Sequence, residues 1–128
     1  MIFVIGGRNQ GKTALARQLW KNTDNPRIAD GRMDSLDVIW QADLILHYES
    51  LVRRLMEEIK EDPAAVTKRL LQEKPDVIIT ADEIGCGVVP MGEFEREYRE
   101  MDGRLCQQIA ASARQVYRVI CGIGTRIK

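Results

Sequence analysis

The sequence has few aromatic residues, no net charge and no long apolar run. Phe, Trp and Tyr make up 5% of the 128 residues, and 19 Lys and Arg residues balance 19 Asp and Glu residues. Without a net positive charge, the chain has no overall field that would draw it onto a nucleic acid or an anionic membrane. No stretch approaches the roughly 18 apolar residues of a membrane span. We therefore predict a protein that binds no nucleic acid and has no membrane span.

Cysteine is also scarce. Cys86, Cys106 and Cys121 are odd in number and far apart, and no CxxC pair occurs. This spacing argues against a disulfide framework and against a structural zinc site. The apolar residues before Gly6 have no basic leader and no small-residue cleavage site, so they do not resemble an export signal. We expect a protein of the reducing cytoplasm.

Strand-like and helix-like segments alternate along the chain. The composition, with 45% hydrophobic and 30% charged residues, is that of a globular protein, and the length predicts one domain over residues 1–128. Strands are predicted over residues 2–5, 27–29, 44–48, 76–80 and 115–121. Helices are predicted over residues 13–20, 35–42, 51–60, 64–73 and 94–114, and residues 124–128 are left as a tail. This order predicts an α/β fold with a mainly parallel sheet, helices on both faces, and ligands at the carboxyl ends of the strands.

A glycine-rich loop matches the pattern G-x-x-x-x-G-K-S/T between the first strand and the first helix. Its residues are Gly6, Gly7, Arg8, Asn9, Gln10, Gly11, Lys12 and Thr13. The glycines let backbone N–H groups turn toward phosphate oxygens, and the helix that follows adds its positive end. Lys12 is expected to reach the β- and γ-phosphates, and the Thr13 hydroxyl to bind Mg²⁺. The loop predicts a P-loop nucleotide-binding domain; with no NKxD motif in the sequence, ATP and GTP are both candidates.

Two carboxylates follow the apolar strand that begins near residue 76. Asp82 and Glu83 stand where a P-loop protein holds Mg²⁺ or its water, although acids on a loop surface would give the same pattern. Gly85, Gly87 and Pro90 then predict a shaped loop close to a ligand, or a structural turn. Cys86, between the two glycines, is a candidate reactive thiol in this loop.

Several segments together resemble the adenosylcobinamide kinase / adenosylcobinamide-phosphate guanylyltransferase family of cobalamin biosynthesis. They are GGRNQGKT, VIITADEIGCGVVP, the helix with Arg96, Tyr98, Arg99 and Gly103, and VICGIGTRIK. The resemblance covers residues 1–22 and 75–128 and implies a three-layer P-loop NTPase-like fold. It further implies that a nucleoside triphosphate phosphorylates the aminopropanol hydroxyl of a corrinoid, and that GMP is then transferred from GTP through a guanylylated histidine. By the same resemblance, residues 6–13 bind the nucleotide, Glu83 is the acid after the strand, Arg96 and Arg99 contact the substrate, and the protein is a homo-oligomer, a trimer. Together with the loop motif, this makes Lys12, Asp82 and Glu83 the candidate catalytic residues and Thr13 and Glu83 the candidate Mg²⁺ ligands.

The middle of the chain departs from that family. Residues 23–43 replace a longer segment that carries the guanylyl-accepting histidine, and Cys106 stands where the family favours Asn. His47, the one histidine, falls where the family has an acidic residue. It is either a packed histidine or a substitute guanylyl acceptor. Three hypotheses remain: a kinase with or without the guanylyl step, a nucleotide- or corrinoid-binding relative without turnover, and an unrelated small P-loop kinase.

Overall fold

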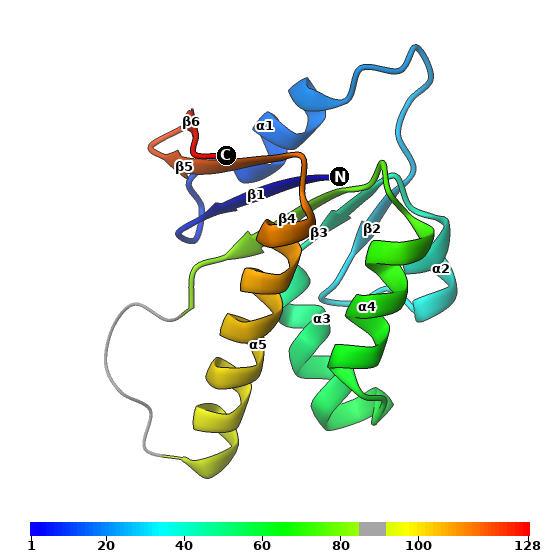
Figure 1. Cartoon of the computed structure of the whole chain (residues 1–128), viewed down its shortest axis with the longest axis vertical. Coiled ribbons are helices and arrows are strands. Elements are labelled where there is room, and N and C mark those ends of the chain that lie inside the picture. Colours follow the sequence, from blue (N-terminus) through cyan, green and yellow to red (C-terminus); the bar gives the residue numbers. More distant parts are fainter. Residues whose placement is uncertain (85–91) are drawn as a thin grey trace.

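Strands and helices alternate along the chain (Figure 1). The computed structural model describes residues 1–84 and 92–128. Within these residues the elements are β1 (Ile2–Gly6), α1 (Lys12–Leu19), β2 (Ile28–Asp30), α2 (Leu36–Gln41), β3 (Leu44–Leu46), α3 (Tyr48–Arg54), a π-helical segment (Leu55–Ile59), α4 (Pro63–Glu73), β4 (Ile78–Asp82), α5 (Glu93–Ser112), β5 (Gln115–Ile120) and β6 (Ile123–Arg126). Each of the predicted strands and helices is present, with ends shifted by a few residues.

The strands form one sheet in the order β2-β3-β4-β1-β5-β6. Paired strands are parallel except β5 and β6, which are antiparallel. This confirms the predicted α/β fold with a mainly parallel sheet. Gly6, at the end of β1, pairs with Asp82, at the end of β4. The register therefore sets the predicted phosphate loop directly beside the predicted acidic strand end.

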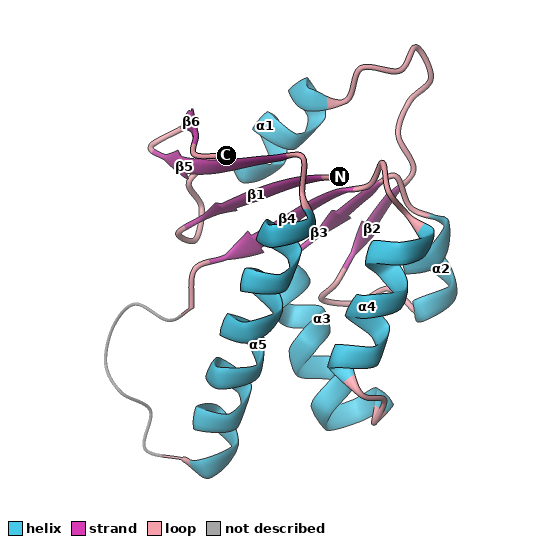
Figure 2. Ribbon diagram, in the orientation of Figure 1, coloured by secondary structure: helices cyan, strands magenta, loops and turns pink. Residues whose placement is uncertain are grey.

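Helices cover both faces of the sheet in three layers (Figure 2). Side chains alternate along β1, so that Ile2 and Val4 pack against Ala16 of α1, while Phe3 faces the larger core under α2 to α5. The larger core also holds Leu51 of α3 and Ile109 of α5.

Even α5, with 20 residues, is strongly charged, and no helix within the described parts of the chain is long and apolar enough to cross a membrane.

Two details differ from the sequence prediction. The strand predicted over residues 44–48 ends at Leu46, because His47 adopts a left-handed conformation and α3 begins at Tyr48. The predicted tail instead contains β6, which forms a hairpin with β5. Cys121 and Gly122 both have positive φ at its two-residue turn, as a type I′ turn requires. The pattern was missed because cysteine is not among the residues that favour such a turn.

Candidate functional site

The predicted phosphate loop connects β1 to the first turn of α1. Asn9 and Gly11 have φ values of 58° and 98°, so the chain turns through the left-handed region twice before α1 begins. Gly6 leaves no room for a side chain, because a Cβ there would lie 2.5 Å from the Val119 carbonyl oxygen. The loop therefore has glycine where a side chain would clash, at Gly6, and where the backbone is left-handed, at Gly11.

The β5–β6 hairpin braces this loop from one side. The backbone N–H of Gly122 donates to the Gln10 carbonyl at 2.8 Å, and the backbone N–H of Cys121 donates to Gln10 Oε1 at 2.7 Å. Gly11 approaches the same turn so closely that a Cβ on it would lie 3.2 Å from the Gly122 Cα. The β5–β6 hairpin, which the sequence analysis did not predict, therefore holds the predicted phosphate loop in its shape.

Lys12 lies at the base of the loop and is buried. Its Nζ donates to the Gly7 carbonyl at 2.7 Å and lies 2.7 Å from Asp82 Oδ1. A buried lysine is stabilised by such a partner, since an unpaired buried charge costs several kcal/mol. The structure thus joins the predicted lysine of the loop to the first of the two predicted carboxylates.

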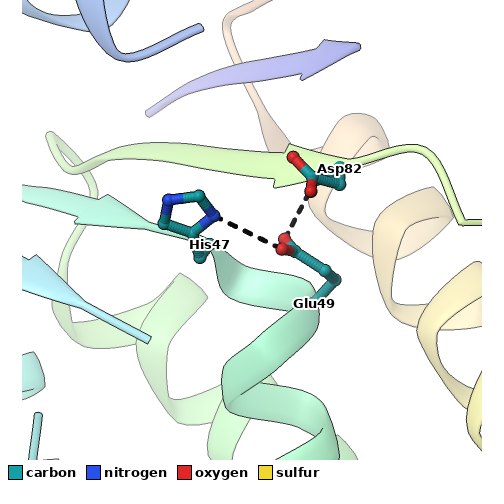
Figure 3. A group of neighbouring side chains, drawn as sticks. All are labelled: His47, Glu49 and Asp82. Atoms are coloured by element: carbon teal, nitrogen blue, oxygen red, sulfur yellow. Dashed lines mark hydrogen bonds and ion pairs between the residues drawn. The ribbon is translucent and has the colours of Figure 1, made fainter. Parts of the chain in front are cut away.

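Glu49 joins the site from the first turn of α3, opposite the loop. Its Oε2 accepts a hydrogen bond from the backbone N–H of Asp82 at 2.9 Å, and its Oε1 lies 3.5 Å from His47 Nδ1. Figure 3 shows the three side chains facing one another, with Glu49 between His47 and Asp82. The His47 backbone is fixed as well, because its N–H donates to Thr80 Oγ1 of β4 at 3.2 Å. One ligand atom from each of the three residues lies within 4.8 Å of the others, close enough to hold a metal ion.

Glu83, predicted with Thr13 as a magnesium ligand, points to a different neighbour. Its two carboxylate oxygens accept hydrogen bonds from Arg118 of β5 at 2.9 and 3.2 Å. Both Thr13 and Glu83 still line the same pocket as Lys12 and Asp82. Their role as magnesium ligands stays a prediction.

The loop, the end of β4 and the start of α3 enclose a pocket of about 820 Å³. Its lining contains most of the predicted site residues, namely Arg8, Asn9, Gln10, Gly11, Lys12, Thr13, His47, Asp82 and Glu83. The lining also contains residues that the sequence analysis did not assign to the site: Arg32, Glu49, Ser50, Arg53, Thr80, Ile84 and Tyr98. The cationic side chains among them suit a polyanionic ligand such as a nucleotide.

The predicted substrate arginines occupy α5 outside this lining. Arg96 and Arg99 are absent from the described residues that enclose the pocket, whereas Tyr98 of the same helix is present. The Tyr98 hydroxyl donates to the Glu49 carbonyl at 2.7 Å, and the Arg53 guanidinium lies 5.1 Å from the centre of the Tyr98 ring. Arg53 also forms an ion pair with Glu95 of α5. These contacts tie α5 to α3 next to the acidic residues of the pocket.

A buried carboxyl group lies behind the pocket, on α5. Asp102 is 3% exposed, and one of its oxygens has no hydrogen-bond partner among the described residues. Burial, and then the negative charges of Glu49 and Asp82, raise the pKa of Asp102 to about 7. Its other oxygen accepts a hydrogen bond from Cys106 Sγ at 3.7 Å, and burial raises the pKa of Cys106 above its ordinary value, so that thiol stays protonated.

Some predicted features lie outside the described residues. Gly85, Gly87 and Pro90, predicted to shape a loop near the ligand, and Cys86, the candidate reactive thiol, all belong to residues 85–91. Of the residues missed, Glu49 had a usable signal: it follows the third strand by three positions, and the carboxyl ends of parallel strands meet at one edge. Arg32 and Arg53 had no comparable signal.

A known protein family matches most of this chain. The family model for cobinamide kinase / cobinamide phosphate guanyltransferase matches residues 33–127, a range that begins after the phosphate loop. The bifunctional adenosylcobalamin biosynthesis protein CobU of Escherichia coli (strain K12) is 42% identical over 52 residues, which are 41% of this chain and 29% of that protein. Its namesake from Salmonella typhimurium (strain LT2) is 35% identical over 74 residues, 57% of this chain and 41% of that protein. The chain therefore matches less than half of the length of these curated relatives.

Proposed function

Because the chain belongs to the cobinamide kinase / cobinamide phosphate guanyltransferase family, we propose that it is a transferase of cobalamin biosynthesis that phosphorylates a cobinamide. The phosphoryl donor is a nucleoside triphosphate, ATP or GTP, held by residues 6–13. The acceptor is the aminopropanol hydroxyl of the corrinoid. The kinase reaction is proposed ahead of the guanylyl step because the four residues that we assign to it, Lys12, Thr13, Asp82 and Glu83, all line the described pocket.

The placement of Lys12 is the observation that carries this proposal. Lys12 is buried at the base of a pocket that is open enough for a nucleotide, and its ammonium group already bridges the loop and Asp82. A phosphate group entering the loop offers the ammonium group an alternative anionic partner. The lysine then neutralises charge that builds on the transferred phosphoryl group, which is the main requirement of phosphoryl transfer.

Magnesium fits the oxygen donors of this pocket. Thr13 supplies a hydroxyl and Glu83 a carboxylate, which are the hard ligands that Mg²⁺ selects. When bound with the nucleotide, the ion supplies charge neutralisation at the β- and γ-phosphates. The Arg118 side chain holds Glu83 in place through two hydrogen bonds, so this carboxylate is positioned before any ion arrives.

The reaction conserves atoms and charge as follows. The corrinoid hydroxyl oxygen forms a bond to the γ-phosphorus, and the bond from that phosphorus to the bridging oxygen breaks. The nucleoside diphosphate leaves with the electron pair of that bond. The hydroxyl proton passes to one of the two carboxylates at the end of β4, Asp82 or Glu83, both of which line the pocket. Arg96 and Arg99, on α5, are our candidates for contacts to the peripheral groups of the substrate.

The guanylyl step is the less supported half of the family activity. The chain has one histidine, His47, and its Nδ1 faces the Glu49 carboxylate. A phosphoramidate at His47 would need this residue to turn its ring toward the α-phosphate. We keep His47 as the only histidine acceptor that the sequence offers, and the test below separates the two steps.

The decisive experiment supplies the protein with Mg²⁺, a cobinamide and labelled nucleotides. We expect label from the γ-position of ATP or GTP to reach the corrinoid, and to be lost in Lys12→Ala. Label from the α-position of GTP retained on the protein, and lost in His47→Asn, would establish the guanylyl step as well. Tight nucleotide binding without transfer from either position would instead identify a binding protein, the second hypothesis, and refute the kinase.

For assembly we propose the homo-oligomer, a trimer, that the family resemblance implies. Ile120, Ile123 and Ile127, at the hairpin edge of the sheet, are each more than half exposed. Burying such side chains at a subunit interface removes apolar area from water. Sedimentation equilibrium tests this: a monomer at all concentrations refutes the proposal, and a trimer that dissociates in Ile123→Glu supports it.

A further inference from the structure

We propose that His47, Glu49 and Asp82 bind a divalent transition-metal ion, of the class of Zn²⁺, Co²⁺ and Mn²⁺, separate from the magnesium ion of a nucleotide. The site joins one imidazole nitrogen to two carboxylates. It stands on these side chains alone and does not depend on the proposed phosphoryl transfer. Its effect is to fasten the start of α3 to the end of β4, at the wall of the pocket that faces the phosphate loop.

The spacing of the donor atoms fits a metal ion. His47 Nδ1 and Glu49 Oε1 are 3.5 Å apart, and an atom of Asp82 completes a group whose members all lie within 4.8 Å. Two ligands bound at about 2.1 Å to one ion lie roughly 3 to 3.5 Å from each other. The first pair already has this separation, and Asp82 needs only a small side-chain movement to join it.

The three residues are held in place by the fold. Glu49 is buried, and the hydrogen bond from the Asp82 backbone to Glu49 fixes the two acidic residues relative to each other. The bond from the His47 backbone to Thr80 Oγ1 fixes the His47 backbone relative to β4, and the imidazole Nδ1 lies 3.5 Å from Glu49 Oε1. Preorganised ligands of this kind bind metal with little loss of conformational freedom.

The charge balance also favours a cation. The side chains of Glu49 and Asp82 are 6% and 15% exposed. Among the described residues, Lys12 pairs with Asp82, whereas the neighbour of Glu49 is the His47 imidazole, 3.5 Å away. Two carboxylates removed from water are costly unless cations or hydrogen bonds compensate. The raised pKa of nearby Asp102, to which both carboxylates contribute after burial, is a sign of this excess negative charge.

The imidazole decides which class of metal is bound. Mg²⁺ prefers six oxygen ligands in a strict octahedron and sheds its water reluctantly, whereas imidazole nitrogen favours later first-row ions and zinc. Of the three donors, His47 is therefore the one that gives selectivity. Replacing it with a carboxylate, in His47→Asp, should shift the preference back toward Mg²⁺ and Mn²⁺.

Lys12 competes with the metal for Asp82. Its ammonium group lies 2.7 Å from Asp82 Oδ1, and a positive charge at this distance opposes a second cation. Removing it in Lys12→Ala should strengthen metal binding by about 10-fold while it weakens nucleotide binding. The two proposals therefore fail separately, because this one variant moves their readouts in opposite directions.

Cobalt titration of the purified, metal-free protein tests the inference. Co²⁺ bound to imidazole and carboxylates gives visible d–d absorption, and we expect saturation at one ion per chain in the presence of excess Mg²⁺. Zn²⁺ should displace the cobalt. His47→Asn and Glu49→Gln should each weaken cobalt binding at least 100-fold, since even outer partners of a metal site change affinity by about 10- to 100-fold. Glu73→Gln, a matched change on the exposed face of α4, should leave it unchanged.

Folding is controlled within the same series. Asn and Asp both tolerate the left-handed backbone of residue 47, so His47→Asn and His47→Asp should retain the circular dichroism of the parent. Zn²⁺ should raise the melting temperature of the parent and of Glu73→Gln but not of His47→Asn. Three results would overturn the site: no cobalt binding, binding unchanged in His47→Asn, or thiolate-to-cobalt absorption, because no cysteine belongs to the cluster.

Discussion

The pocket has two walls that are built in different ways. The loop wall, residues 6–13, is one continuous segment whose glycines and lysine follow a recognisable pattern. The acidic wall, formed by His47, Glu49 and Asp82, comes from two elements more than thirty residues apart in the sequence. Only the adjacent placement of β3 and β4 in the sheet brings its members together. A site made of one segment can be recognised from local sequence, whereas a site made by strand order needs the fold.

Within residues 1–84 and 92–128, one ion pair joins the two walls, between Lys12 and Asp82. The loop wall contributes Lys12 and the acidic wall contributes Asp82, so a substitution in either wall changes the electrostatic environment of the other. The predictions that follow separate the walls, from the largest expected effect to the smallest.

Lys12→Ala should have the largest effect on activity. It removes the cation that, in our proposal, stabilises the transferred phosphoryl group, and we expect a loss of about 1,000-fold in phosphoryl transfer to the corrinoid. The measurement is the rate of γ-label transfer under saturating nucleotide. The cobalt spectrum of the same variant is the control, because the acidic wall should remain able to bind metal. Retention of more than a tenth of the activity would mean that Lys12 has no catalytic role.

A pair of glycine substitutions separates the two walls. Gly6→Ala would press a Cβ against the Val119 carbonyl at 2.5 Å, whereas Gly31→Ala would press one against the carbonyl oxygens of His47 and Leu46. Each contact is with backbone, which cannot move aside cheaply, so we expect each variant to lose about 3 kcal/mol in the free energy of unfolding.

The two glycine variants should each lose the binding of a different ligand. Gly6→Ala is expected to weaken nucleotide binding and leave cobalt binding intact, and Gly31→Ala to do the reverse. Urea unfolding, nucleotide titration and cobalt titration on both variants measure the difference. Equal loss of both ligands in both variants would show that the walls form one cooperative unit.

The fold was predictable because its signals are periodic and local. Apolar runs and glycine turns located the five parallel strands, and Asp62 with Pro63 marked the start of α4, where the Asp62 side chain accepts from Ala64 N. The glycine-rich pattern of residues 6–13 is equally local. The hairpin strand β6 was not, since Cys121 is a poor residue for positive φ and the segment carries no alternation that predicts a buried face.

The acidic wall was only half predictable. Asp82 follows a clear strand, and the parallel sheet places its end near the loop. Glu49 directly follows the predicted strand, which is its signal, but its contact with Asp82 depends on β3 ending at Leu46 rather than at residue 48. The left-handed turn at His47 ends the strand early and rotates Glu49 toward Asp82. No feature of the local sequence specifies that turn.

Asp102→Asn should change how stability depends on pH. With its pKa raised to about 7 by burial, Asp102 keeps its proton in the folded state at pH values where the unfolded chain has already lost it. The free energy of unfolding of the parent should therefore fall as the pH rises from about 4 to 7, and level off above 7. Asn carries no proton to lose, so the variant should be more stable by about 2 kcal/mol above pH 7 and little different near pH 4.

Urea unfolding at several pH values measures this effect, with Glu73→Gln as an exposed control whose profile should follow that of the parent. If the free energy of unfolding of Asp102→Asn changed with pH in the same way as that of the parent, Asp102 would ionise normally. The structure would then give one indication fewer of excess negative charge near the acidic wall.

Gln10→Ala should have the smallest effect and should touch the loop wall alone. The substitution removes the side-chain acceptor for the Cys121 N–H, an exposed hydrogen bond worth about 1 kcal/mol, while the Gln10 carbonyl still accepts from Gly122. The loop should become less well positioned, which raises the KM for nucleotide several-fold and leaves kcat nearly unchanged. Cobalt affinity should stay at the parent value, because the hairpin braces the loop and makes no contact with His47 or Glu49 among the interactions described. A fall in kcat equal to the rise in KM would instead mean that the hairpin positions Lys12 for the reaction itself.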